Sequence, residues 1–210
     1  MDIKVLFTDL LTRIGFSGPE AATHWSDLEK VYSHKSRHYH NLNHLQEMIV
    51  CWEQEKPHLH FPDEVLYAIF YHDYIYKSTK KNNELKSAER AVVLLPSVTI
   101  VNSERIFNLI LSTKDHQCSS NEDEKWLIDF DLKILSKEWE DYILYAQQIR
   151  KEYRIYPDFM YNPGRKKALQ HFLENKYIYQ TDTFRNLYEA KARENVNREI
   201  AFLSHPNFKI

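Results

Sequence analysis

Two histidines and two aspartates interrupt apolar stretches of this 210-residue sequence. His72 and Asp73 adjoin each other in AIFYHDYIY, where an ionised carboxylate is costly unless it is paired or bound to a metal. His44 ends the histidine-rich segment RHYHNLNH, and Asp131 lies in LIDFDLKIL. One divalent cation held by two imidazoles and two carboxylates, at about 2.1 Å each, would satisfy all four groups. The residue types therefore predict a metal site.

The helix that must carry His72 is predicted from an apolar stripe. Pro62 suits the first turn of a helix. The residues at helical spacing behind it are Val65, Ile69, His72 and Tyr76. His72 is therefore expected on the buried face. His44 is expected near the start of an earlier helix, capped by Asn43, with an apolar face in phase behind it.

A second stripe distinguishes the two aspartates near residue 130. Asp131 shares a helical face with Leu127, Phe130 and Ile134. It is therefore expected to point into the protein and to need a partner. Asp129 lies about 200 degrees round the helix from Leu127, so it is expected to face water. Replacing Asp129 with Ala is accordingly expected to do little.

Helical spacing and capping residues extend over most of the chain. Ser17 and Glu20 form a capping box, and the acidic run 122–124 suits the positive end of a helix. Further helices are expected over 83–95 behind an Asn83 cap, and over 103–116, 136–153, 163–176 and 183–203. With no strand pattern and no internal repeat, residues 1–210 are predicted to form a single globular all-α domain of about nine or ten helices.

Composition argues against several classes of function. The formal net charge is −2 and the cations are spread along the chain, so nucleic acid is not an expected partner. Three scattered glycines cannot supply GxGxxG, P-loop or GxSxG motifs. No apolar run reaches the roughly 20 residues that cross a bilayer, and no signal peptide is recognisable. Because Cys51 and Cys118 are too few for a disulfide framework, a reducing, cytoplasmic location without a membrane partner is expected.

The chain resembles the HD-domain superfamily, specifically the small bacterial branch of predicted metal-dependent HD phosphohydrolases. The resemblance rests on the order His, His-Asp, Asp and on segments that cover most of the chain. These segments are RHYHNLNHLQEM (37–48), AIFYHDYIY (68–76), NNELKSAERA (82–91), LSTKDH (111–116), LIDFDLKIL (127–135), IRKEY (149–153), GRKKALQHFL (164–173) and ARENVNREI (192–200). The resemblance implies a multi-helix HD-domain, phosphodiesterase-like fold.

The resemblance also implies a ligand set and a reaction. It assigns His44, His72, Asp73 and Asp131 as ligands of one divalent ion, drawn from Mn, Mg, Fe, Ni, Co and Zn. The implied reaction is hydrolysis of a phosphate ester or anhydride, in a nucleotide or another small phosphorylated compound. The ion would lower the pKa of bound water and polarise a phosphoryl oxygen, while Asp73 or Glu84 handles the proton.

Contacts with the substrate are expected from four further residues. Arg37 and Lys114 are expected to neutralise phosphate charge. His116 is expected to reach the site from the end of the helix predicted over 103–116. His40 lies four residues before His44 and could replace it as the ligand if the helix begins early. With His44 as the ligand, His40 is expected to support the ligands from outside or to face the substrate. His116 is the one histidine between the His-Asp doublet and the last Asp. Related proteins that hold two metals use additional histidines in this interval, so the sequence favours a single ion.

Two other interpretations stay open on the sequence alone. The first is a non-catalytic module that keeps the metal and binds a nucleotide, and the second is a structural helical protein whose buried polar groups pair with each other. Metal content separates the second from the rest, and turnover separates an enzyme from a binding module. A homodimer is compatible with the sequence, and Arg165, Arg193 and Asn195 fall in matching segments without an assigned role.

Overall fold

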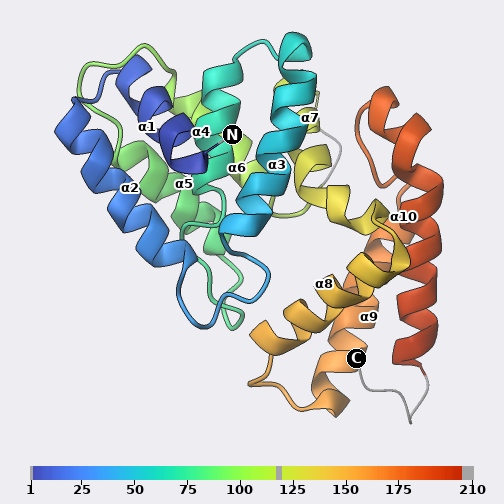
Figure 1. The fold of residues 1–210 in the computed structure, drawn as a ribbon. Helices are drawn as coiled ribbons and strands as arrows, with labels where there is room; N and C mark the ends of the chain where they lie inside the picture. Colours follow the sequence, from blue (N-terminus) through green and yellow to red (C-terminus); the bar gives the residue numbers. More distant parts are fainter. Residues whose placement is uncertain (1, 117–119, 205–210) are drawn as a thin grey trace. The chain divides into compact units, whose positions relative to one another are not determined.

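A computed structural model describes residues 2–116 and 120–204, and every regular element in them is a helix (Figure 1). The described ranges contain no strand, which confirms the all-α class. Within them, no helix is both long and apolar enough to cross a bilayer. The chain divides into two compact units, residues 1–130 and 131–210, and the single domain expected over 1–210 stays a prediction. Cys51 is buried, and Cys118 lies outside the described residues.

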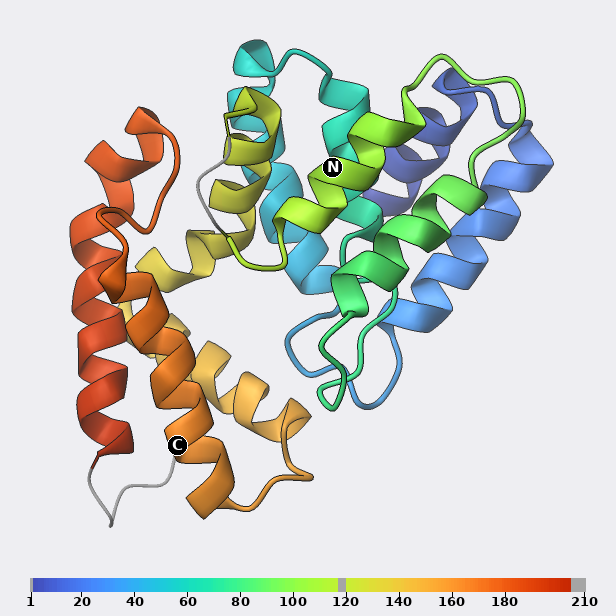
Figure 2. The same ribbon diagram turned by 180° about the vertical axis from the view of Figure 1, so that it is seen from behind.

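The first unit is built around one buried helix. Its helices are α1 (Ile3–Arg13), α2 (Gly18–Tyr32), α3 (Leu42–Glu55), the 3-10 helix η1 (Lys56–His58), α4 (Pro62–Tyr71), α5 (Asn83–Val93), α6 (Ser103–Ser112) and α7 (Glu122–Leu132). Every residue of α4 from Glu64 to Tyr71 is buried, and α4 contacts α1, α3, α5 and α6. Figure 2 shows α5 and α6 side by side. A helix that is apolar on all sides belongs in a core, and α4 carries His72 at its end.

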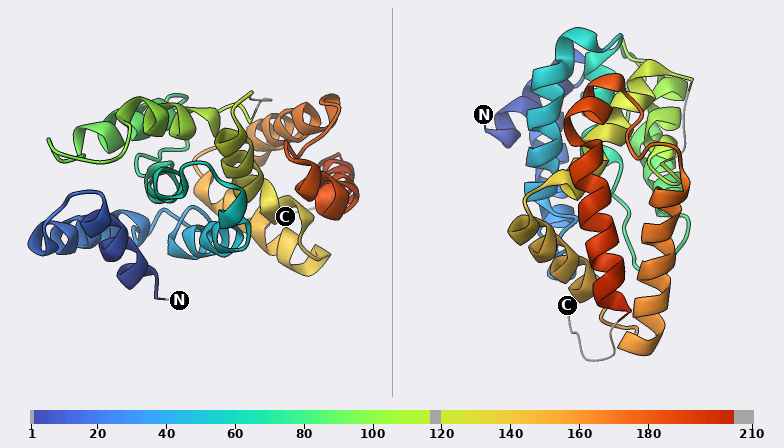
Figure 3. Two further views of the ribbon diagram at one scale, coloured as in Figure 1. Left: turned by 90° about the horizontal axis from the view of Figure 1, so that it is seen from above. Right: turned by 90° about the vertical axis from the view of Figure 1, so that its right-hand side faces the viewer.

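The second unit packs its long last helix against the elements before it. Its helices are the 3-10 helix η2 (Lys133–Ser136), α8 (Trp139–Glu152), α9 (Asp158–Glu174) and α10 (Asp182–Leu203). α10 lies along α9 and contacts η2 (Figure 3). The Asn195 side chain donates to the carbonyls of Leu135 and Lys137 at 2.9 and 2.8 Å. Arg193 donates to the carbonyls of residues 175 and 176 at 2.9 Å. Asn195 thus joins α10 to η2 and the residue after it, and Arg193 joins α10 to the segment after α9.

Several predicted helix ends are confirmed and others are displaced. The Ser17 capping box is present, with the Glu20 carboxylate accepting from the Ser17 N–H at 2.8 Å. The predicted Asn43 cap is wrong, because the cap of α3 is Asn41, whose side chain accepts from the Asn43 N–H at 2.8 Å. The cap of α5 is the residue before Asn83, and α9 begins at 158 with Pro163 inside it. The stripe to Tyr76 is also shorter than predicted, because α4 ends at residue 71.

Candidate metal centre

The ring of His72 is oriented by the helix that it ends. His72 caps the carboxyl end of α4 and is only 1% exposed. Its Nδ1 lies 2.9 Å from the carbonyl oxygen of Ile69, and a carbonyl can only accept a hydrogen bond. Nδ1 therefore carries the proton, and in the neutral ring Nε2 carries the lone pair. A backbone carbonyl that fixes the tautomer in this way is one of the common outer partners of a metal-binding histidine.

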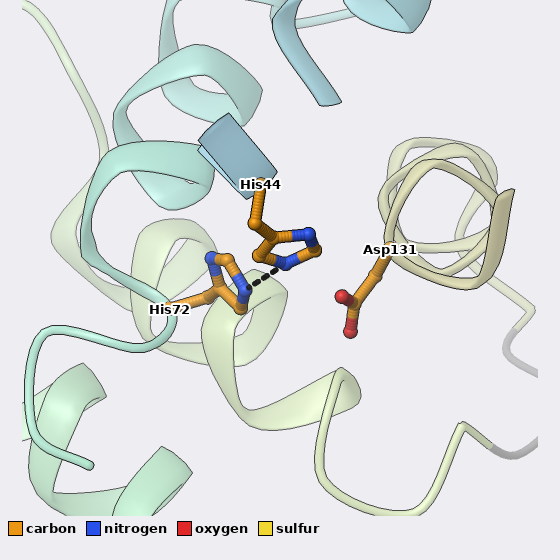
Figure 4. A group of neighbouring side chains, drawn as sticks. All are labelled: His44, His72 and Asp131. Atoms are coloured by element: carbon orange, nitrogen blue, oxygen red, sulfur yellow. Dashed lines mark hydrogen bonds between the residues drawn. The ribbon is translucent and has the colours of Figure 1, made fainter. Parts of the chain in front are cut away.

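His44 presents the matching nitrogen from α3. It is buried, and its Nε2 lies 3.3 Å from Nε2 of His72 (Figure 4). Two nitrogens that each lie about 2.1 Å from a tetrahedrally coordinated ion are about 3.4 Å apart, so the separation fits chelation of one ion. A proton shared between the two rings is the other arrangement that satisfies the pair. Metal content separates these two states.

Asp131 completes a three-residue cluster. One ligand atom from each of His44, His72 and Asp131 lies within 4.8 Å of the other two, and the Asp131 carboxylate points toward the imidazoles in Figure 4. Asp131 is the first residue of the second unit, but it lies within α7, a continuous helix that begins at Glu122. Two imidazoles and a carboxylate are ligands that divalent ions accept, so this cluster could hold a metal ion.

Asp73 and His40 lie next to this cluster. Asp73 is buried just beyond the end of α4, with its Oδ2 3.2 Å from His72 Nε2. The Nε2 of His40 lies 3.8 Å from the same Asp73 oxygen, and the His40 ring stacks near Tyr76 with centroids 4.2 Å apart. The structure therefore brings the four predicted ligands and His40 into one neighbourhood. The roles of Asp73 as a ligand and His40 as a substrate-facing group stay predictions.

The predicted helical placement of His116 is wrong. α6 ends at Ser112, and His116 has a positive φ of 48 degrees in the following segment. The hydroxyls of Ser112 and Thr113 donate to the Leu109 and Ile110 carbonyls at 2.8 Å, so side chains bind backbone groups at the helix end. The predicted contact of His116 with the substrate stays a prediction.

The other candidates from the sequence lie on or near the surface. Glu84 is partly buried in the first turn of α5. The Lys114 side chain is 43% exposed, with its Nζ 3.9 Å from a carboxylate oxygen of Asp115. Arg37 is partly buried, and its guanidinium contacts backbone carbonyls, as described below. The proton-handling role of Glu84 and the phosphate contacts of Lys114 and Arg37 stay predictions.

Asp129 is the residue that the helical phase placed wrongly. It is 0% exposed, whereas the stripe argument predicted that it faces water. The reason is that residues 126–130 of α7 are all buried, so this helix has no solvated face there. The run WLIDF, which is apolar on both sides of the aspartate, is the signal that could have shown this burial.

Replacing Asp129 with Ala is now expected to lower the free energy of unfolding by about 1–3 kcal/mol, because groups that hold a buried carboxylate lose their acceptor. Urea denaturation measures the change. Asp27→Ala is the matched control, since Asp27 is exposed on α2 and its loss should change stability by less than about 0.5 kcal/mol. Equal stability of the two variants would contradict the expected stabilising role of the buried Asp129 carboxylate.

The candidate centre joins residues that are far apart in the sequence. His44 comes from α3, His72 from the end of α4 and Asp131 from α7. The resemblance to HD-domain phosphohydrolases rests on the sequence segments quoted above and stays a prediction. Comparison of the chain with family models, with curated proteins and with solved structures found no match.

Proposed function

We propose that this protein is a metal-dependent phosphohydrolase that cleaves a phosphate ester or anhydride in a small compound such as a nucleotide. The observation that carries the proposal is the pair of Nε2 atoms of His44 and His72, 3.3 Å apart, with Asp131 in the same cluster. Imidazole nitrogen with carboxylate oxygen suits one ion from Mn, Fe, Co, Ni or Zn, with Mg as the weaker candidate.

The chemistry assigned to the centre divides between the ion and the chain. When bound, a divalent ion would lower the pKa of a water molecule and polarise a phosphoryl oxygen. Asp73 lies beside the cluster, where its carboxylate can accept the proton of the attacking water. Glu84, in the first turn of α5, is the second candidate for this role. His40, 3.8 Å from the Asp73 oxygen, can orient that carboxylate or contact the substrate.

The positive charge of the loop between α4 and α5 supports the proposal that the substrate is anionic. This loop follows Asp73 in the chain and carries the exposed cations Lys77, Lys80 and Lys81. The Asn83 side chain fixes it, accepting from the Lys77 N–H at 3.1 Å and donating to the Lys77 carbonyl at 3.0 Å. Local positive charge in a chain of net charge −2 favours a small phosphorylated compound over a nucleic acid.

The test is phosphate release by the purified protein after chelation and after reconstitution with each of Mn, Co, Ni, Zn and Mg. The substrates are nucleotides, sugar phosphates and inorganic pyrophosphate. We expect turnover with at least one metal, and a rate at least about a hundredfold lower in the chelated protein. Stoichiometric metal without turnover on any compound would instead favour the binding module. Failure to bind any metal would favour the structural interpretation.

A further inference from the structure

Arg37 ties two separate stretches of backbone together within the first unit. It lies in the loop between α2 and α3. Its Nη1 donates to the carbonyl oxygens of His40 at 3.1 Å and Asp73 at 2.8 Å, and its Nη2 donates to that of Tyr74 at 2.9 Å. His40 is separated from the other two accepting residues, Asp73 and Tyr74, by more than thirty positions in the chain. One guanidinium therefore holds the loop before α3 against the turn after α4.

Aromatic rings fix the guanidinium in this position. The central carbon of Arg37 lies 4.7 Å from the centroid of the Tyr32 ring and 5.6 Å from that of Tyr76. The Tyr32 hydroxyl in turn donates to the carbonyl of Phe70 in α4 at 3.0 Å. A guanidinium over ring faces gains electrostatic attraction, and its planar fork needs little further ordering to bond several carbonyls. The three hydrogen bonds of Arg37, called the clamp below, are therefore anchored to the core helix α4.

The clamped backbone is the part of the candidate centre that the helices hold least. Asp73 lies two residues beyond the end of α4, outside the regular helix. The Tyr74 N–H donates to the Tyr71 carbonyl at 3.1 Å, so a single turn continues the chain there. The bonds from Arg37 to the carbonyls of Asp73 and Tyr74 restrict where the Asp73 carboxylate can point. The third bond holds the main chain of His40.

We propose that Arg37 is a positioning residue of the proposed metal centre. It fixes the backbone of Asp73 and His40, so that the ligand atoms are already in position when the ion binds. This inference rests on the proposed metal centre and gives Arg37 a task other than contact with phosphate. Loss of an outer partner typically weakens metal affinity about 10–100-fold. The same loss is therefore expected when the clamp is removed.

The experiment titrates Co²⁺ into metal-free protein and follows visible absorption, for the parent, Arg37→Met and Arg37→Lys. Arg150→Met is the matched control, because Arg150 donates to the carbonyls of Tyr153 and Tyr156 at 3.1 and 3.0 Å and lies 4.6 Å from the Tyr161 ring centroid. None of these residues is a candidate ligand. We expect Arg37→Met to bind Co²⁺ about 10–100-fold more weakly with an altered spectrum, and Arg150→Met to bind like the parent.

Arg37→Lys keeps the charge but cannot span three carbonyls with one compact ammonium, so its affinity should stay below that of the parent. It decides the matter if Arg37→Met does not fold, as shown by circular dichroism. Parent-like Co²⁺ affinity and spectrum in the folded Arg37 variants would overturn the positioning role and leave the proposed function intact. Absence of Co²⁺ binding by the parent would overturn both.

Discussion

Replacing His72 with Ala is expected to remove the bound metal and to lower phosphate release by more than about a hundredfold, which is the upper range for loss of an outer partner alone. The physical reason is that the imidazole of His72 supplies a ligand atom, Nε2, which lies 3.3 Å from Nε2 of His44. The Ile69 carbonyl sets the tautomer of this ring. Alanine supplies no ligand atom. Elemental analysis of the purified variant, before and after reconstitution, measures the first effect, and phosphate release measures the second.

The control separates loss of a ligand from loss of a histidine. His171→Ala removes an imidazole from α9 whose side chain is 49% exposed, and this variant should keep the metal and the activity of the parent. Urea denaturation of metal-free protein shows whether His72→Ala is folded, since truncation in the core also leaves a cavity. A folded His72→Ala protein with the parent's metal content would show that His72 does not hold the metal.

Sequence patterns located the side chains of the centre better than the contacts that orient them. His72 and Asp131 were identifiable because polar residues on an apolar stripe need partners, and the structure places both with His44 in one cluster. The contacts of Arg37 were not predictable, because its acceptors are backbone carbonyls and any residue type offers one. Its charge suggested phosphate, whereas its geometry shows contact with the main chain.

Helix type was predictable where helix ends were not. The segment after His72 keeps the apolar period through Tyr76 and contains neither Gly nor Pro, so nothing in it marks the end of α4. The chain nevertheless leaves the helix there, and the side chains of Asn83 and Ser87 hold the following loop through hydrogen bonds to residues 77 and 75. Bonds from a later helix thus override the local period, and a sequence window contains no trace of them.

The second unit contains a buried ion pair between Glu199 and Arg165, which the sequence left without a role. Arg165 donates through Nε and Nη2 to the two carboxylate oxygens of Glu199 at 2.8 and 3.1 Å, and Glu199 is 0% exposed. The Tyr142 hydroxyl donates to the same carboxylate at 2.6 Å, and Arg165 also donates to the Tyr145 hydroxyl at 3.2 Å. Burial, reinforced by the Glu199 charge, raises the pKa of Tyr142, so its hydroxyl stays a donor.

Replacing Arg165 with Met is expected to lower the free energy of unfolding by about 3–5 kcal/mol, because it leaves the Glu199 carboxylate buried without its cation. Urea denaturation followed by circular dichroism measures the loss. Lys191→Met is the control within the same unit, since Lys191 pairs at 3.3 Å with a Glu138 side chain that is 79% exposed. Removal of that pair should cost less than about 1 kcal/mol.

The double variant Arg165→Met with Glu199→Leu distinguishes the cost of an unpaired charge from the loss of contacts. Apolar residues in place of both members of a buried pair are often neutral or stabilising, so the double variant should recover most of the stability that Arg165→Met loses. If the double variant is instead less stable than Arg165→Met, the hydrogen bond from Tyr142 to Glu199 and the packing around the pair carry the stability. If Arg165→Met costs no more than Lys191→Met, the ion pair contributes nothing beyond a surface contact.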